Sequence, residues 1–240
     1  MRLSLMVYEL FLMVISLAVY GGAFTLSAAS WIALTRLLPF GWPWWGFLMP
    51  IPVVVFILGV IAGVGFLSFL LPTLKPGHYT APTSPTFYIW TVYLSLNRLV
   101  FIEPLHSLIL YSSVLRYLAL RALGAKLAYG SSLSARVNFT DLPFIEIGEG
   151  CIVGANSFLT GHYLNKGNLF LGKIVIGQRV NVGGYCRVGP GVEIGDDTWI
   201  GTDCQIAPMV TVGKGCTIEP GSTLPPGTHL PDGSIYPRLS

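Results

Sequence analysis

The chain has 240 residues, of which 52% are hydrophobic and only 10% are charged, and its formal net charge is +3. A soluble domain carries about 25% charged residues, so this composition argues against a protein that is soluble along its whole length. No basic cluster interleaved with aromatic side chains occurs in the sequence, so nucleic acid is not an expected partner.

Residues 1–74 are predicted to form a membrane anchor. No charged residue occurs between Leu10 and Thr35 or between Leu37 and Leu74. Each stretch exceeds the roughly 20 apolar residues that cross a bilayer as a helix, so we place two transmembrane helices near 10–31 and 47–71. The aromatic segment 41–45 between them is typical of an interfacial turn.

Basic residues predict the orientation of this anchor. Arg36 alone lies between the two predicted spans, whereas basic residues recur after the second span, of which the first five are Lys75, Arg98, Arg116, Arg121 and Lys126. This bias places the rest of the chain on the cytoplasmic side of a bacterial inner membrane.

Residues 75–124 are predicted to be a linker followed by amphipathic helices near 86–102 and 105–123. Pro104 separates the two helices, and polar residues interrupt both. We expect these helices to lie at the membrane interface, with membrane lipids as partners. A second helical hairpin through the membrane is the alternative for this segment.

Residues 125–240 follow a six-residue period. An aliphatic residue recurs at every sixth position, glycine usually follows it, and a small residue stands four positions after it. This period is typical of a parallel β-helix, in which short strands wind around a triangular prism. The inward aliphatic positions are Ile176, Val182, Val188, Ile194, Ile200, Ile206, Val212, Ile218, Leu224 and Leu230.

Stacking of the coils follows from this period. Three hexads make one coil, so residues eighteen apart should lie about 4.8 Å apart on adjacent coils. We therefore expect Arg179 to stack with Asp197, and Gln178, Asp196 and Lys214 to form an outward column. All four cysteines occupy small inward positions, which favours buried apolar thiols over a metal site or a disulfide.

The register is interrupted at residues 160–173, which are predicted to form a protruding loop. An insertion in a strict repeat is usually where function resides. The loop carries His162, which no packing position of the repeat explains. An imidazole titrates near neutral pH, so His162 suits a general base.

The hexads Ile194–Trp199, Ile200–Gln205 and Ile206–Thr211 resemble those of the left-handed β-helix acyltransferases, the hexapeptide-repeat family. The resemblance covers roughly 127–235 and implies an all-β left-handed parallel β-helix that assembles as a homotrimer. It also implies an enzyme that moves an acyl group from a thioester, such as acetyl coenzyme A, to a hydroxyl or an amine. A loop histidine serves as the base in this family, and His162 is the matching residue.

A narrower similarity extends toward the amino terminus. The order of two spans, the motif Lys75–Tyr79, the segment Leu118–Lys126 and the motif Asp141–Pro143 resembles the membrane-bound terminal unit of ε-poly-lysine synthetase-like peptide synthetases. Those units form amide bonds from aminoacyl thioesters on a carrier protein. This chain has a single such unit and neither an adenylation nor a carrier domain, so a separate carrier protein would be a partner.

Further residues near the loop in the stacking are candidates for substrate contact. Asp141 lies about one coil before the loop and is positioned to orient His162 or to bind an amine. The substrate-binding candidates are Asp141, Asn156, Asn181, Tyr185 and Trp199. No metal cluster and no Gly-rich phosphate loop occurs, so the expected co-substrate is an acyl thioester, carried by coenzyme A or by the pantetheine of a carrier protein.

Three functions remain open from the sequence. The chain is predicted to be a membrane-anchored acyltransferase with His162 as general base. The first alternative is an amide-bond-forming ligase that uses an aminoacyl carrier-protein thioester. The second alternative is a non-catalytic trimeric membrane scaffold.

Overall fold

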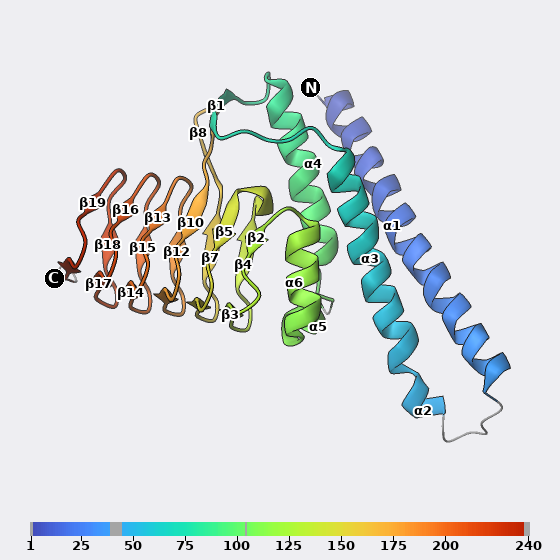
Figure 1. Cartoon of the computed structure of the whole chain (residues 1–240). Coiled ribbons are helices and arrows are strands. Elements are labelled where there is room, and N and C mark those ends of the chain that lie inside the picture. The colour runs from blue at the N-terminus through green and yellow to red at the C-terminus, as the bar shows by residue number, and fades with distance from the viewer. Residues whose placement is uncertain (1, 39–44, 104, 238–240) are drawn as a thin grey trace.

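The computed structural model describes residues 2–38, 45–103 and 105–237 and divides into a helical part and a solenoid (Figure 1). Helix α1 (Arg2–Leu37), the short α2 (Trp45–Leu48) and α3 (Pro50–Leu70) form the outermost layer. The segments Glu9–Leu37 and Gly46–Leu70 are long and apolar enough to cross a membrane. The aromatic turn predicted at 41–45 lies almost entirely outside the described residues.

A second helical layer connects this hairpin to the solenoid. It consists of α4 (Pro85–Val100), α5 (Leu105–Tyr111) and α6 (Ser113–Ala122). The single helix predicted over 105–123 is two helices, because Ser112 leaves helical geometry with φ −98° and ψ 118°. The Ser112 hydroxyl accepts a hydrogen bond from the backbone nitrogen of Leu115 and caps α6.

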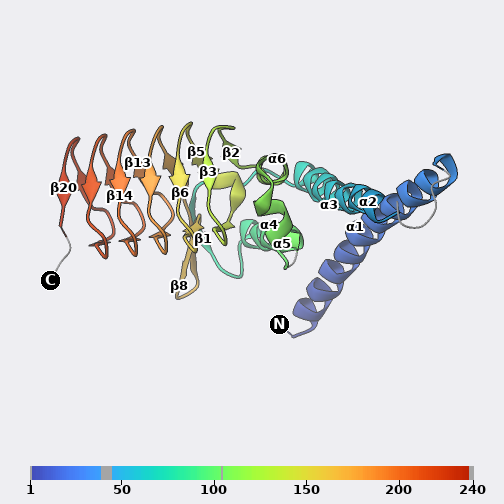
Figure 2. The same ribbon diagram turned by 90° about the horizontal axis from the view of Figure 1, so that it is seen from below.

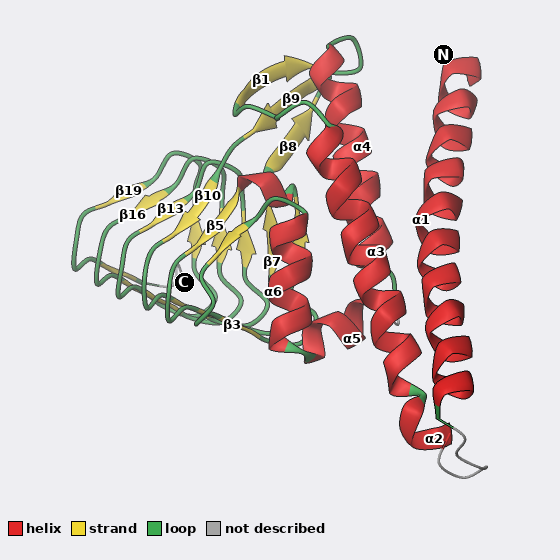
Figure 3. Ribbon diagram, turned by 45° about the vertical axis from the view of Figure 1, so that its right-hand side comes forward, coloured by secondary structure: helices red, strands yellow, loops and turns green. Residues whose placement is uncertain are grey.

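The solenoid has three faces of parallel strands, and successive strands step from one face to the next (Figures 1 and 3). The first face contains β2 (Lys126–Leu127), β5 (Ile145–Ile147), β10 (Ile174–Ile176), β13 (Glu193–Ile194), β16 (Thr211–Val212) and β19 (His229–Leu230). The second contains β3 (Ser132–Leu133), β6 (Ile152–Val153), β11 (Asn181–Val182), β14 (Trp199–Ile200), β17 (Thr217–Ile218) and β20 (Ile235–Tyr236). The third contains β4 (Asn138–Thr140), β7 (Phe158–Thr160), β12 (Arg187–Val188), β15 (Gln205–Ile206) and β18 (Thr223–Leu224).

The predicted inward positions form the core of the prism. The aliphatic positions from Ile176 to Leu224 and the small positions from Val180 to Ser222 are buried. The glycines allow the coils to approach closely: a Cβ on Gly195 would lie 2.6 Å from the carbonyl carbon of Gly213 on the next coil. The hexad pattern in the sequence is thereby confirmed.

The predicted outward columns are also present. Arg179 donates two hydrogen bonds to Asp197, from Nε at 2.6 Å and from Nη2 at 2.8 Å. Asp196 accepts a hydrogen bond from the backbone nitrogen of Gln178 at 2.9 Å and pairs with Nζ of Lys214 at 3.1 Å. Charged side chains on adjacent coils therefore stack in complementary pairs.

One hairpin leaves the solenoid between the third and first faces, in the segment predicted to protrude. It consists of β8 (His162–Asn165) and β9 (Asn168–Leu171), which pair antiparallel. Strand β1 (Gly77–Thr80), from the linker after the first hairpin of helices, pairs with the other edge of β9. The motif that contains His78 is thus part of the same small sheet as His162.

A small apolar core fixes this sheet to the helical part. Its buried members come from the linker, from α4, from the turn before β5 and from β9: Leu74, Trp90, Phe144, Leu169 and Leu171. The inserted hairpin is therefore held from both sides, by the prism and by α4.

Candidate active site

His162 is the first residue of β8 and follows the end of β7 by one glycine. That glycine, Gly161, packs against the chain one coil below, where a Cβ would lie 2.9 Å from the Cβ of Asp141. The close approach brings the backbones of the two coils together at the point where the hairpin leaves the prism. It places the side chain of His162 directly beside that of Asp141.

The imidazole of His162 is hydrogen-bonded to Asp141, with 2.6 Å between Nδ1 and Oδ2. The Asp141 side chain is completely buried, whereas 24% of the His162 side chain is exposed. A carboxylate partner favours the tautomer that carries its proton on Nδ1. Nε2 then keeps its lone pair and is the ring nitrogen able to accept a proton from a substrate.

Asp141 adopts the left-handed backbone conformation, with φ 59°, at the corner that precedes the turn Leu142–Phe144. Aspartate tolerates this conformation better than most residues with a side chain. The hexad register shifts by two residues at this corner, because Ile147 follows the inward position Phe139 by eight residues instead of six. The irregular corner thus turns the carboxylate toward the inserted hairpin.

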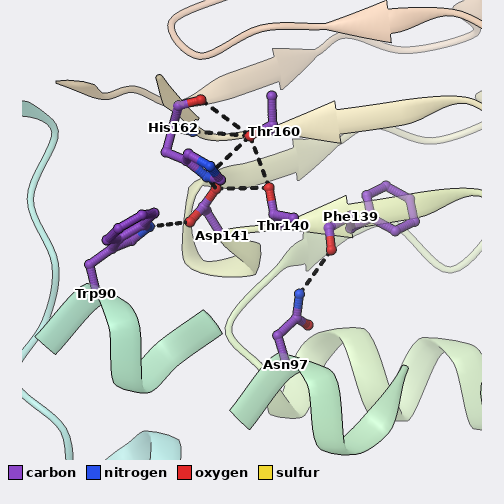
Figure 4. A network of polar contacts seen from close by, with 7 residues as sticks. All are labelled: Trp90, Asn97, Phe139, Thr140, Asp141, Thr160 and His162. Atoms are coloured by element: carbon purple, nitrogen blue, oxygen red, sulfur yellow. Dashed lines mark hydrogen bonds and ion pairs between the residues drawn. The ribbon is translucent and has the colours of Figure 1, made fainter. Parts of the chain in front are cut away.

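Three further side chains surround this pair (Figure 4). Nε1 of Trp90 donates to Oδ1 of Asp141 at 2.6 Å, and the hydroxyl of Thr140 donates to Oδ2 at 2.9 Å. Oγ1 of Thr160 lies 3.0 Å from Oγ1 of Thr140 and 3.2 Å from Nδ1 of His162. The buried carboxylate therefore has a partner for each oxygen, as a buried charge requires.

Trp90 also contacts the imidazole ring itself. Its indole lies edge-on to His162, with the ring centroids 4.9 Å apart and the planes at 65°. Trp90 belongs to α4, outside the repeats, and is 5% exposed. Sequence reasoning missed this residue, because no local pattern in α4 distinguishes it from an ordinary apolar helix position.

His162 faces a cavity of about 680 Å³ on the third face of the solenoid. Its floor is the outward column of that face, which includes Phe158, Arg187 and Gln205, and its side walls include turn residues such as Pro190. Apolar walls with a few polar groups are typical of a small-molecule site.

The predicted substrate-binding residues divide into two groups. Asp141 contacts His162, and Asn156 lines the cavity. Asn181 and Trp199 lie in register on the second face, and Tyr185 is an exposed residue at φ 61° in the turn that leads to the third face. None of these last three is among the residues that line the cavity in this single chain.

The remaining polar groups give no indication of a metal. Within the described residues, no group of three or more His, Cys, Asp or Glu side chains could hold a metal ion. The four cysteines are free and buried, as members of the small inward positions. Burial raises the pKa of the Cys151 thiol, so this group is held in its neutral form.

Comparison with known families identifies the repeat. Residues 191–226 match the family described as bacterial transferase hexapeptide (six repeats). Residues 145–161 and 173–202 match the family described as hexapeptide repeat of succinyl-transferase. The gap between these two segments coincides with the inserted hairpin that carries His162. No curated protein matches the sequence.

Several solved structures are similar to part of this chain. A maltose O-acetyltransferase from Clostridium difficile 630 is 16% identical, with a TM-score of 0.48 over 67% of this chain and 87% of that chain. A hexapeptide-repeat acetyltransferase from Vibrio cholerae, solved with acetyl coenzyme A, is 16% identical, with a TM-score of 0.43 over 64% and 84%. A hexapeptide transferase family protein from Anaplasma phagocytophilum is 22% identical, with a TM-score of 0.38, and this match spans 44% of this chain and only 58% of that protein.

Proposed function

We propose that this chain, whose carboxy-terminal half is a left-handed β-helix of the hexapeptide-repeat acyltransferase type, transfers an acyl group from a thioester to a hydroxyl or an amine. The observation that carries the proposal is the hydrogen bond between His162 and the fully buried Asp141 beside an open cavity. A histidine oriented by a buried carboxylate is the arrangement that general-base catalysis requires.

In the proposed reaction, Nε2 of His162 removes the proton from the acceptor as the acceptor oxygen or nitrogen attacks the thioester carbonyl. The carbonyl carbon–sulfur bond then breaks, and the imidazolium returns the proton to the leaving thiolate. The carboxylate of Asp141 stabilises the imidazolium between these two steps. The products are the acylated acceptor and a free thiol, so no other reactant is needed.

The thioester donor is an acyl coenzyme A or the acylated pantetheine of a carrier protein. The cavity contains Arg187, whose positive charge suits an anionic group on the donor or the acceptor, and Asn156 adds a polar contact.

We propose that the chain works as a homotrimer. In such an assembly, the exposed aromatic residues Tyr185 and Trp199 and the nearby Asn181 would contact a neighbouring subunit or the donor.

We further propose that α1 and α3 hold the enzyme at the cytoplasmic face of the inner membrane. The two helices provide the long apolar segments that such attachment requires. An acceptor that is itself attached to lipid would then be held close to the cavity.

The second candidate is an amide-forming ligase that takes an aminoacyl group from a carrier protein. It is favoured by the position of β1, because the motif Lys75–Tyr79 that resembles those ligases pairs with the hairpin that carries His162. The chemistry at His162 is the same for both candidates, and the acyl donor distinguishes them.

The experiment is a transfer assay with the purified full-length protein, using acetyl coenzyme A and an aminoacyl carrier-protein thioester as separate donors. The variant His162→Ala should lose about 10²- to 10⁴-fold in rate with the active donor. Activity within a few-fold of the unmodified protein would exclude His162 as the base. No transfer from either donor would favour a non-catalytic scaffold.

A further inference from the structure

Helix α3 lies along the second helical layer over its whole length. Near its start, Val53 shares an apolar groove with Leu115 of α6. Near its end, Gly65 packs so closely on α6 that an added Cβ would lie 3.0 Å from the Cβ of Ala122. The order of these contacts shows that α3 and α6 run side by side and parallel (Figures 1 and 3).

The same layer is attached to the first coil of the solenoid. Arg116, at the amino-terminal end of α6, donates from Nη1 to the carbonyl oxygen of Leu133 at 3.0 Å. The other end of α6 leads directly into β2 at Lys126. Asn97 of α4 donates from Nδ2 to the carbonyl oxygen of Phe139 at 2.8 Å. The first coil therefore occupies the same level along α3 as α6 does.

This arrangement conflicts with a bilayer crossing by α3. If α3 spanned the membrane, the contacts of α6 at Leu115 and Ala122 would place the first coil between the two membrane surfaces. Arg116, the exposed Ser132 and the irregular turns of that coil would then lie at the depth of the hydrocarbon. Charged groups and lipid-exposed irregular backbone are strongly disfavoured there.

The helices are apolar on the side away from the coils. Figures 1 and 2 show the coils stacking away from the helical layers, with α1 as the outermost element. Apart from the side chains that contact α3, such as the buried Val19 and Ala23, α1 exposes large apolar groups around its surface. These exposed groups are Leu10, Phe11, Met13, Val14, Leu17, Phe24, Leu26 and Ile32.

We infer that α1 and α3 lie along the membrane plane within the cytoplasmic leaflet, so that the apolar face away from the coils is covered by lipid hydrocarbon. The solenoid then stands on the bilayer with its coils stacking away from it. This inference rests on the membrane attachment in the proposed function, and it replaces a crossing hairpin by an in-plane one.

The charges of the second layer agree with this placement. Arg116, Arg121 and Lys126 lie on the solenoid side of α3, at the level where anionic lipid head groups would contact them. His162 follows the second coil, so it stands only about 5–10 Å above the first coil at the usual strand spacing. A lipid-attached acceptor would need to rise only a short distance to reach it.

The test is a depth measurement with spin labels on single cysteines at Ile51, Leu58 and Phe69, which are exposed and lie within about 20° of one another around α3. Full-length protein is placed in vesicles of phosphatidylethanolamine and phosphatidylglycerol, and collisions with oxygen and with a water-soluble nickel complex report depth. Successive positions are about 10 and 16 Å apart along the helix. Ile235, at the far end of the solenoid, is the matched exposed control.

The in-plane arrangement predicts that the three depths agree within about 5 Å, or one helical turn. A Leu58 label about 10 Å deeper than the Ile51 and Phe69 labels would overturn the inference and leave membrane attachment and acyl transfer intact. Labels as accessible to nickel as Ile235 would overturn both the inference and the attachment. Acyl-transfer activity is assayed on the same samples, and it tests the proposed function independently of the depth of the labels.

Discussion

The indole of Trp90 lies edge-on to the imidazole of His162, with 4.9 Å between the ring centroids. Trp90 comes from a helix of the amino-terminal part, whereas His162 comes from an insertion in the solenoid. The two rings meet beside the carboxylate of Asp141, which is hydrogen-bonded to both side chains. The candidate site is therefore built jointly by the solenoid and by the helical part.

The variant Asp141→Asn should abolish most of the activity without removing the base. An asparagine amide that donates to Nδ1 of His162 would leave the ring proton on Nε2, where a proton acceptor is needed. We expect a loss of about 10²- to 10⁴-fold in kcat, similar to that of His162→Ala. Because the two residues act as a unit, the double variant should be no slower than His162→Ala alone. An additive loss in the double variant would contradict a shared role.

The variant Trp90→Phe should lower kcat and leave KM unchanged. Phenylalanine keeps an apolar ring but removes the donor to Oδ1 of the buried Asp141, which costs about 1–3 kcal/mol for an unpaired buried acceptor. We therefore expect a loss of roughly tenfold or more in kcat, measured at saturating donor. Trp90 does not line the cavity, so substrate affinity should be retained.

Phe87→Leu is the control for this variant. Phe87 packs against Trp90 on α4, with the ring centroids 5.6 Å apart, but donates no hydrogen bond to the site. An equal loss of activity in Phe87→Leu would assign the effect to packing of the helix. A normal kcat in Trp90→Phe would show that the donor to Asp141 is dispensable.

The solenoid could be predicted from the sequence because its register repeats. Each aliphatic position, such as Ile200, is constrained by the same neighbours one coil above and below, so ten hexads carry the same pattern. The hairpin that starts at His162 was visible as a break in that pattern. Asp141 was found together with His162 because it lies about one coil before the loop, although nothing in the hexads gives the distance between the two side chains.

The contribution of the helices could not be predicted in the same way. Trp90 and Asp141 are 51 residues apart, and the indole donor meets the carboxylate only because α4 packs over the inserted hairpin. The boundary at Ser112 was missed because the apolar pattern continues across it, and only the cap geometry ends one helix and begins the next. Such features depend on tertiary contacts rather than on local propensity.

The variant Gly161→Ala should damage both stability and activity. Its methyl group would lie 2.9 Å from the Cβ of Asp141 and 3.2 Å from that of Phe144, in a place where neither backbone can move freely. We expect a destabilisation of about 1–3 kcal/mol, measured by thermal unfolding, and a displaced carboxylate that lowers kcat. Gly130→Ala is the matched control, because its Cβ would be in ordinary contact at 3.4 Å. A fully active, stable Gly161→Ala protein would contradict the close approach.

The four cysteines should be unreactive in the folded protein. All four are buried in the prism, so a reagent in solution cannot reach the sulfur atoms while the coils stay stacked. We expect no thiol to react with a colorimetric disulfide reagent within minutes at pH 7.5, and all four to react in guanidinium chloride. A chelator should change neither the result nor the unfolding temperature. Rapid reaction of a thiol in the native state would indicate an exposed or functional cysteine.

The Arg179–Asp197 pair should make the stability of the solenoid depend on pH. The hydrogen bonds from Arg179 hold the pKa of the Asp197 carboxyl below its ordinary value. A carboxyl with a lowered pKa in the folded state adds stability above its unfolded pKa, and that contribution is lost as the pH falls through the lowered value. Arg179→Gln should therefore unfold at a slightly lower temperature than the unmodified protein at pH 7, with the difference disappearing near pH 2.

Arg187→Gln, which removes a charge that forms no ion pair with any described residue, is the control. A difference for Arg179→Gln that persists unchanged at acid pH would show that the arginine stabilises the coil through its packing rather than through the carboxylate.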